Sequence, residues 1–380
     1  MMKRCGFLVF SLFLLLLLSS CGGKKGENSL TGDSAKKSEN EIITRASLLS
    51  IEERDGYDLV SIKNSPDDPW PSRYALVSDS STTSGNLPED AVRINVPLKA
   101  AVIDSEVYAS LLEEIGADSV IKGMFDTSFL SSPSLKEKVE SGAVVDVGSP
   151  SEPNREKIIA LSPQLITLSY FTGMDARNIE KAGVPVLKMM DLNESSPLGR
   201  AEWVRLFGRL VGQREKADSI FDAVSANYED LKQTALQRSY RPKVLTELVY
   251  EGVWYVSGGA SYQAQLIRDA GGRYFMDSDP QSGSVGLSVE QVLEKGNDAD
   301  VWLIKIFGEN LTKKSLLAKD SRYGQFRPFT TGNIYFSDTS ANSLFRDFPF
   351  HPDLLLKEYI NIFSKDEEER GNLVYFKKIS

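Results

Sequence analysis

A long stretch of helical periodicity near the middle of the chain, residues 197–238, limits the possible folds more than any other feature. Ser196 followed by Pro197 marks a helix start, because serine caps free N–H groups and proline fits the first helical position. Apolar residues then recur at helical spacing as far as Gly212, where we expect a first helix over residues 197–211 to end. A second amphipathic helix is predicted from 213 to 238, since Pro242 forbids much continuation.

This second helix would be about 39 Å long at 1.5 Å per residue, roughly the width of a domain. A helix of that length is either part of a bundle core or a strut between two lobes, and the flanking sequence favours the strut. Short apolar runs alternate with helical patterns both before it, from residue 98, and after it, from residue 239. Such alternation is typical of parallel sheets wrapped by helices. We therefore predict an α/β fold of two Rossmann-like lobes joined by one long connecting helix.

The boundaries follow from these patterns. We expect an N-lobe at residues 98–196, a helical connector at 197–238 and a C-lobe at 239–380. Residues 41–97 lack this alternation of strands and helices, and short strands are predicted there at 58–62 and 74–77. We expect them to form a small N-terminal β extension. In the C-lobe, residues 252–256 are predicted to form a hairpin with the strand at 243–248.

The composition restricts the function. A formal net charge of −9 argues against a nucleic-acid partner. The chain has one histidine, His351, which excludes a histidine-rich metal site, and no cofactor or metal is predicted. No G-x-S-x-G nucleophile motif is present, and His351 before Pro352 and Asp353 is typical of a helix start. We expect a monomer.

The N-terminus has the pattern of a secretory signal. Lys3 and Arg4 precede an apolar run that ends in Leu-Ser-Ser-Cys, with the cysteine at Cys21. This ending resembles the bacterial lipobox, which implies a signal at residues 1–20, cleavage before Cys21, acylation of its thiol and a membrane anchor. A signal cut without lipid attachment is the alternative. Residues 21–40 are rich in Gly, Lys, Ser and Glu and are predicted to be a flexible tether.

Several segments together resemble the substrate-binding proteins of bacterial ABC importers, in the helical-backbone group that serves siderophores, haem and cobalamin. They are residues 97–114 (PLKAAVIDSEVYASLLEE), 154–168 (NREKIIALSPQLITL), 182–186 (AGVPV), 257–272 (SGGASYQAQLIRDAGG), 287–304 (LSVEQVLEKGNDADVWLI) and 351–358 (HPDLLLKE). Each motif is weak alone, whereas their order and spacing are specific. The resemblance implies a lipid-anchored protein of the cell envelope that passes an iron complex or corrinoid to an ABC permease dimer.

Ligand contacts are expected from loops at the carboxyl ends of strands, in a cleft between the lobes. Aromatic side chains there bury large areas, and Lys or Arg can hold carboxylates or iron chelates. The candidates are Tyr170, Phe171, Trp254, Tyr255, Tyr262, Lys305, Phe307, Phe345 and Arg346. The resemblance does not name the ligand.

Two glutamates occupy matching positions in the two lobes. Glu156 follows Asn154 and Glu290 follows Ser288, so each lies in the first turn of a predicted helix. The helix dipole alone would explain them. In the family that the chain resembles, the glutamates at these motif positions pair with arginines of the two permease subunits, which implies the same docking role here.

Two other functions remain open at this point. One is a cell-envelope hydrolase or chelatase on the same scaffold, since fold alone does not decide function. The other is a surface lipoprotein that captures its ligand without an importer. No catalytic residue is predicted, because the chain has a single histidine and no nucleophile motif, and no cysteine would stay free once Cys5 leaves with the signal and Cys21 is acylated.

Overall fold

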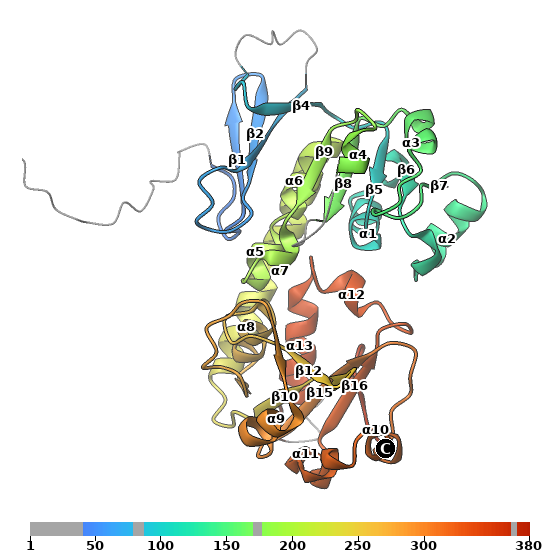
Figure 1. Ribbon diagram of the computed structural model, residues 1–380. Helices are drawn as coiled ribbons and strands as arrows, with labels where there is room; N and C mark the ends of the chain where they lie inside the picture. The colour runs from blue at the N-terminus through green and yellow to red at the C-terminus, as the bar shows by residue number, and fades with distance from the viewer. Residues whose placement is uncertain (1–40, 79–86, 170–176, 366–370) are drawn as a thin grey trace, which may run out of the picture. The chain divides into compact units, whose positions relative to one another are not determined.

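The computed structural model describes residues 41–78, 87–169, 177–365 and 371–380 (Figure 1). The predicted signal and tether at residues 1–40, with Cys21, lie outside the described residues, and so do Tyr170 and Phe171. All described residues belong to one compact unit, Ser38–Ser380.

The N-terminal extension is a four-stranded sheet in the order β1 (Leu49–Arg54), β2 (Tyr57–Ile62), β3 (Ser72–Val77) and β4 (Ala91–Asn95). The first three strands are antiparallel, and β4 runs parallel to β3. The sequence predicted β2 and most of β3 but neither β1 nor β4. In β4 only Ile94 is buried, so the strand lacks a clear apolar pattern. One face of the sheet packs into the same hydrophobic core as the N-lobe.

The N-lobe contains a five-stranded parallel sheet in the order β7-β6-β5-β8-β9. The strands are β5 (Ala101–Ile103), β6 (Ile121–Met124), β7 (Val145–Asp146), β8 (Leu165–Ser169) and β9 (Val186–Met189). Alternate strand residues face two separate apolar clusters, one with α1 (Glu106–Ile115) and the other with α3 (Arg155–Leu161) and α4 (Arg177–Glu180). The remaining helix, α2 (Pro133–Glu140), begins at its cap Ser132. The sheet is thus covered on both faces.

The C-lobe has a second five-stranded sheet in the order β13-β10-β15-β16-β17. Its parallel strands are β10 (Lys243–Thr246), β13 (Arg273–Tyr274), β15 (Val301–Ile306) and β16 (Ile334–Asp338), and β17 (Lys377–Lys378) is antiparallel. The helices of the C-lobe are α8 (Tyr262–Asp269), α9 (Val289–Gly296), α10 (Lys313–Lys319), α11 (Arg327–Thr331), α12 (Leu344–Asp347) and α13 (Pro352–Ile362).

The predicted hairpin in the C-lobe is wrong. The strand β12 (Val253–Ser257) pairs with β11 (Val249–Tyr250) and β14 (Ser284–Leu287), and β10 pairs with β13 and β15. Glu247 has a positive φ of 64° directly after β10, so the chain turns out of the first sheet there. The turn places the three-stranded sheet β11-β12-β14 next to the main one rather than within it.

The connector consists of three helices, α5 (Pro197–Ala201), α6 (Val204–Val211) and α7 (Arg214–Leu236). The hydroxyl of Ser196 accepts a hydrogen bond from Gly199 N at 3.1 Å, which caps α5 as the sequence predicted. The single helix predicted over 197–211 is divided at Glu202 and Trp203. Gly212, with φ of 73°, ends α6, and an added Cβ at Gly208 would lie 2.4 Å from the Cβ of Ala217, so α6 and α7 pack closely.

The long helix α7 belongs to both cores (Figure 1). Its first half contributes Ala217, Phe221 and Val224 to the N-lobe core, and its second half contributes Tyr228 and Ala235 to the C-lobe core. The helix is therefore a rigid element shared by two α/β lobes. This arrangement confirms the fold class predicted from the sequence.

Candidate functional site

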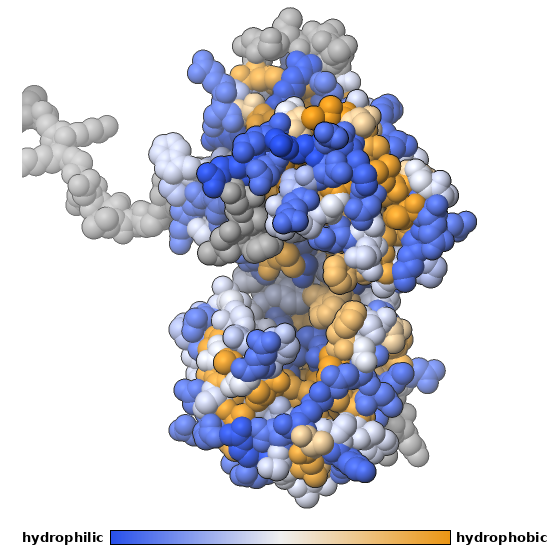
Figure 2. Space-filling view, turned by 45° about the vertical axis from the view of Figure 1, so that its right-hand side comes forward, coloured by the Kyte–Doolittle hydropathy of each residue, from blue (hydrophilic) through white to orange (hydrophobic). Residues whose placement is uncertain are grey.

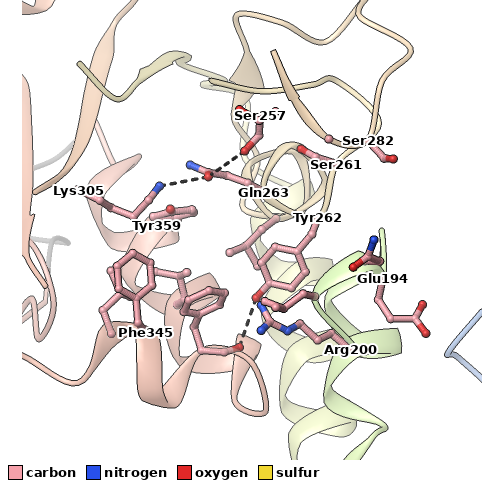
Figure 3. Close-up of a pocket in the computed structure, with 18 residues that line it drawn as sticks. Glu194, Arg200, Ser257, Ser261, Tyr262, Gln263, Ser282, Lys305, Phe345 and Tyr359 are labelled. Carbon is pink, nitrogen blue, oxygen red and sulfur yellow. Dashed lines mark hydrogen bonds between the residues drawn. The ribbon is translucent and has the colours of Figure 1, made fainter. Parts of the chain in front are cut away.

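A pocket of about 380 Å³ lies between the connector and the C-lobe (Figure 3). We call it the C-lobe pocket. It is lined by the end of the turn η4 (Asp191–Asn193), α5, the start of α8, β15, α12 and the middle of α13. Arg200, Tyr262, Gln263, Lys305 and Phe345 supply its main polar and aromatic side chains.

A glycine turn brings α8 to this pocket. An added Cβ at Gly259 would lie 2.4 Å from the carbonyl oxygen of Met276, so no larger residue fits there. Ser261 then caps the helix by accepting a hydrogen bond from Ala264 N at 3.1 Å. Tyr262 and Gln263 follow in the first turn and line the pocket. The glycine turn and the serine cap thus set the start of α8, and with it the backbone positions of Tyr262 and Gln263.

Tyr262 is held in place at the pocket wall. Its hydroxyl donates to the carbonyl oxygen of Phe348 at 3.3 Å (Figure 3). Burial raises the pKa of Tyr262, partly offset by the charge of Arg200, so the phenol is neutral at physiological pH. It therefore offers an aromatic face and a hydroxyl, without charge.

Arg200 joins the N-lobe to the pocket. Its Nε donates to Oδ2 of the buried Asp191 at 3.1 Å, and the hydroxyl of Tyr108 on α1 donates to Oδ1 of the same carboxylate. The guanidinium carbon lies 5.9 Å from the ring centre of Tyr262 and 5.3 Å from that of Phe348. These distances fit cation–π contacts, so the arginine ties α1 and α5 to the aromatic wall of the C-lobe.

Lys305 lies near the end of β15. Its ammonium forms an ion pair with Glu247 and donates to Oε1 of Gln263 at 3.1 Å. The hydroxyl of Ser257 donates to the same oxygen at 3.3 Å (Figure 3). These four residues form a connected polar group, of which Ser257, Gln263 and Lys305 line the pocket.

A second hollow, of about 540 Å³, has walls from both lobes. We call it the interlobe hollow. Its aromatic residues are unusually exposed, with Phe129 of the N-lobe at 80%, Phe307 at 75% and Phe345 at 47%. Lys136 and Arg346 lie on its border. Phe345 lines both cavities, so the interlobe hollow lies next to the C-lobe pocket.

The structure brings together five of the nine predicted ligand residues. Tyr262, Lys305 and Phe345 line the C-lobe pocket, and Phe307, Phe345 and Arg346 line the interlobe hollow. Tyr170 and Phe171 lie outside the described residues.

The other two predicted ligand residues lie elsewhere. Trp254 is fully buried in the C-lobe core, stacked on Trp302 with ring centres 5.8 Å apart, and its Nε1 donates to the carbonyl oxygen of Thr246 at 2.9 Å. Tyr255 is 51% exposed and lines neither cavity. Adjacent strand residues point to opposite faces, so β12 directs one side chain into the core and the other into solvent.

The sequence reasoning missed Arg200, Gln263 and Tyr359. Arg200 lies in the helical pattern that was treated only as a connector. Gln263 stands directly after Tyr262 in a helix start that the sequence does show, and its position in the first turn was the available signal. Tyr359 is one of several apolar residues of α13, and nothing in the sequence marks it as a pocket residue.

Glu156 and Glu290 are both exposed in the first turns of α3 and α9, as the sequence predicted. Asn154 accepts from Lys157 N at 3.1 Å, and Ser288 accepts from Gln291 N at 3.2 Å. The two glutamates differ in their partners: Oε1 of Glu290 lies 2.5 Å from Nη1 of Arg322, whereas Glu156 has no ion pair among the described residues. The docking role stays a proposal.

Among the described residues, no group of three or more His, Cys, Asp or Glu side chains is placed to hold a metal ion. None of the helices in this part of the chain has the length and apolar character needed to cross a membrane. The surface in Figure 2 is mostly hydrophilic, with hydrophobic residues in separate patches.

Two α/β lobes on a shared helix, with a cleft lined by aromatic and basic side chains, define a two-lobed binding protein. The model of the periplasmic binding protein family matches residues 108–341, and the chain belongs to this family. As a member of this family it is a binding protein rather than an enzyme, which argues against the hydrolase and chelatase alternatives.

The chain is similar to two uncharacterised lipoproteins of Methanocaldococcus jannaschii. One is 30% identical over 224 residues, which cover 56% of this chain and 53% of the relative. The other is 28% identical over 292 residues, which cover 70% of this chain and 73% of the relative. The chain thus spans about half the length of the first relative.

Solved structures share the fold at low sequence identity. A periplasmic haem-binding protein of Pseudomonas aeruginosa matches with a TM-score of 0.56 and 15% identity, over 74% of this chain and 98% of that one. A periplasmic vitamin B12-binding protein of Vibrio cholerae matches with a TM-score of 0.52 and 13% identity, over 73% and 99%. At these identities the likeness shows the fold alone.

Proposed function

We propose that this protein captures an iron complex, such as a siderophore or haem, or a corrinoid, and delivers it to an ABC importer. The observation that carries the proposal is the pair of neighbouring cavities, the C-lobe pocket and the interlobe hollow, which share Phe345. The interlobe hollow has three exposed phenylalanines, and aromatic surface of this kind is costly to leave in water unless a ligand covers it. The solved structures with the same fold include haem and vitamin B12 binders.

The protein would work at the membrane. Acylation of Cys21 would anchor it, with residues 21–40 as a tether and residues 1–20 as the removed signal. A single acyl chain binds membranes only marginally, so several chains on this cysteine would be needed for stable anchoring. Replacement of Cys21 by Ser is expected to move the protein from the membrane fraction to the supernatant after cell disruption.

The binding experiment uses the full-length protein in detergent. Calorimetric titrations with haem, cyanocobalamin and ferric siderophores are expected to show one site, with a dissociation constant of about 1 μM or below. Exclusive binding of free metal ions, sugars or peptides would contradict the proposal.

Substitutions of residues that line the interlobe hollow, compared with a control substitution elsewhere on the surface, test where the ligand binds. Phe129→Ser and Phe307→Ser are each expected to weaken binding by about tenfold, because each removes apolar area from the interlobe hollow. Tyr250→Ser is the control, since Tyr250 is 68% exposed but lines neither cavity. Equal effects at all three positions would mean that the ligand binds elsewhere.

A further inference from the structure

The amide of Gln263 has a fixed orientation in the C-lobe pocket. The atom that faces Lys305 Nζ at 3.1 Å must be the oxygen, because an ammonium group only donates hydrogen bonds. The hydroxyl of Ser257, at 3.3 Å, can donate to the same oxygen. The two contacts settle which end of the amide is the oxygen and which is the nitrogen Nε2.

The amide nitrogen of Gln263 lacks a hydrogen bond within the described part of the chain. Nε2 is buried and forms no hydrogen bond with any described residue. A buried donor without an acceptor is unfavourable, and native proteins nearly always satisfy such groups. Because Gln263 lines the pocket, a bound ligand is the natural source of the missing acceptor.

The cations of the pocket are already neutralised by the chain itself. Glu247 pairs with Lys305, and Asp191 pairs with Arg200 at 3.1 Å. Glu247 is held rigidly, since its backbone N donates to Leu303 O at 2.9 Å and its carbonyl oxygen accepts from Trp302 Nε1 at 2.9 Å. The ion pair with Lys305 is thus built into the turn after β10.

The one acidic side chain of the lining is also satisfied internally. Glu194 accepts hydrogen bonds from Leu48 N at 2.9 Å and from the hydroxyl of Ser47 at 2.8 Å, and Trp203 Nε1 donates to it at 3.1 Å. Among the described residues, no uncompensated positive charge therefore lines the C-lobe pocket. A ligand group with a full negative charge would lose its hydration there without gaining a free cation.

We infer that Gln263 is the specificity-determining donor of the C-lobe pocket, and that it selects a ligand with an uncharged acceptor oxygen, such as an amide or hydroxamate carbonyl of an electrically neutral complex. Ligands whose binding groups are carboxylates or catecholates are disfavoured. This inference rests on the proposed function and narrows its range of ligands.

The test compares four probes with the full-length protein by calorimetry. Two are neutral, cyanocobalamin with its amide side chains and a ferric trihydroxamate. Two are anionic, haem with its carboxylates and a ferric tricatecholate. We expect the tightest probe to be neutral and at least about tenfold tighter than either anionic one.

Two variants test the mechanism. Gln263→Glu, which replaces the donor nitrogen by an oxygen, is expected to weaken the tightest neutral probe by about tenfold or more. The control Gln265→Glu makes the same chemical change on the same helix, at a residue that does not line the pocket, and should bind like the parent. Glu247→Gln uncovers the charge of Lys305 and should strengthen an anionic probe by about tenfold. Melting curves of each variant verify folding.

The outcomes are distinct. Tighter binding of an anionic probe by the parent, or unchanged binding by folded Gln263→Glu, overturns the inference and leaves the proposed function intact. If none of the four probes binds, the proposed function fails and the inference falls with it.

Discussion

Nε2 of His351 lies 2.9 Å from Oε2 of Glu114, and this contact joins the two lobes directly. His351 precedes α13 of the C-lobe, and Glu114 lies in the last turn of α1 of the N-lobe. The hydrogen bond to Glu114 raises the pKa of His351, and burial opposes the rise. Asp353 and Asp347 also face the imidazole and raise its pKa further.

The stability of the protein should therefore decline as the pH rises through neutrality. The pKa of His351 is raised above its ordinary value of 6.5. The protonated imidazole therefore stabilises the folded protein fully below pH 6.5, and this stabilisation is lost as the pH rises past the raised pKa. Both side chains are partly exposed, so we expect a loss of only about 0.5 kcal/mol.

Thermal melts between about pH 6 and pH 8 test this loss, because this window contains the titration of histidine. His351 is the single histidine of the chain, so His351→Gln should abolish most of the change, and Glu114→Gln should reduce it. An identical pH profile in the parent and His351→Gln would rule out the contact as its source.

A buried carboxylate anchors the start of the described chain to the connector. Glu202, fully buried after α5, accepts hydrogen bonds from the backbone N of Thr44, Arg45 and Ala46 at 2.9, 2.7 and 2.9 Å. Glu202→Gln removes one acceptor oxygen and the charge, and should lower the free energy of unfolding by about 2 kcal/mol.

Chemical denaturation measures this change, and hydrogen exchange at residues 44–46 should become faster. The exposed Glu294→Gln on α9 is the control and should stay within about 0.5 kcal/mol of the parent. A Glu202→Gln protein as stable as the control would mean that the backbone amides find other acceptors.

Trp254 is expected to be a core residue rather than a ligand contact. Trp254→Ala removes a fully buried ring and should destabilise the protein by about 3–5 kcal/mol. The neighbouring Tyr255→Ala, at a side chain that is 51% exposed, should cost less than about 1 kcal/mol. Denaturant titration gives both values. If Trp254→Phe stays stable but loses ligand affinity, the residue has the binding role that the sequence first indicated.

The two exposed glutamates are expected to serve docking on the importer. Glu156→Arg and Glu290→Arg should leave ligand affinity unchanged but reduce ligand uptake by cells, and the double variant should be worse, because reversed charge slows association with a positively charged partner. Uptake in cells and titration of the purified variants separate the two effects.

Arg322→Ala is the matched control for Glu290→Arg. Glu290 forms an ion pair with Arg322. Hydrogen bonds at the start of the helix and the charge of Arg322 lower the pKa of Glu290. The control breaks the same ion pair while keeping the negative charge, so uptake should stay near the parent level. Normal uptake by Glu156→Arg and Glu290→Arg would show that these residues only stabilise helix starts.

Local patterns in the sequence predicted much of the architecture. Ser196, Pro197 and Gly212 set the ends of the first connector helices through local backbone chemistry, and the structure shows those ends. The break at Glu202 and Trp203 was not predicted, and nothing in the local sequence shows that the Glu202 carboxylate binds residues 44–46, more than 150 positions away. The hairpin was predicted wrongly because the residues of a short apolar strand do not show which other strand it pairs with.

The sequence by itself determined the two-lobe organisation, because helix periodicity and strand alternation are properties of neighbouring residues. It also placed Tyr262 at a helix start and Lys305 at the end of a strand, and the structure brings both residues to the C-lobe pocket. Only the tertiary structure decided that Trp254 is core and that Gln263 holds an unpaired donor in the pocket. Packing between segments that are distant in the sequence decides which residues are buried and which hydrogen bonds form. The contact of Lys305 with Gln263 is an example, and no local sequence pattern predicts it.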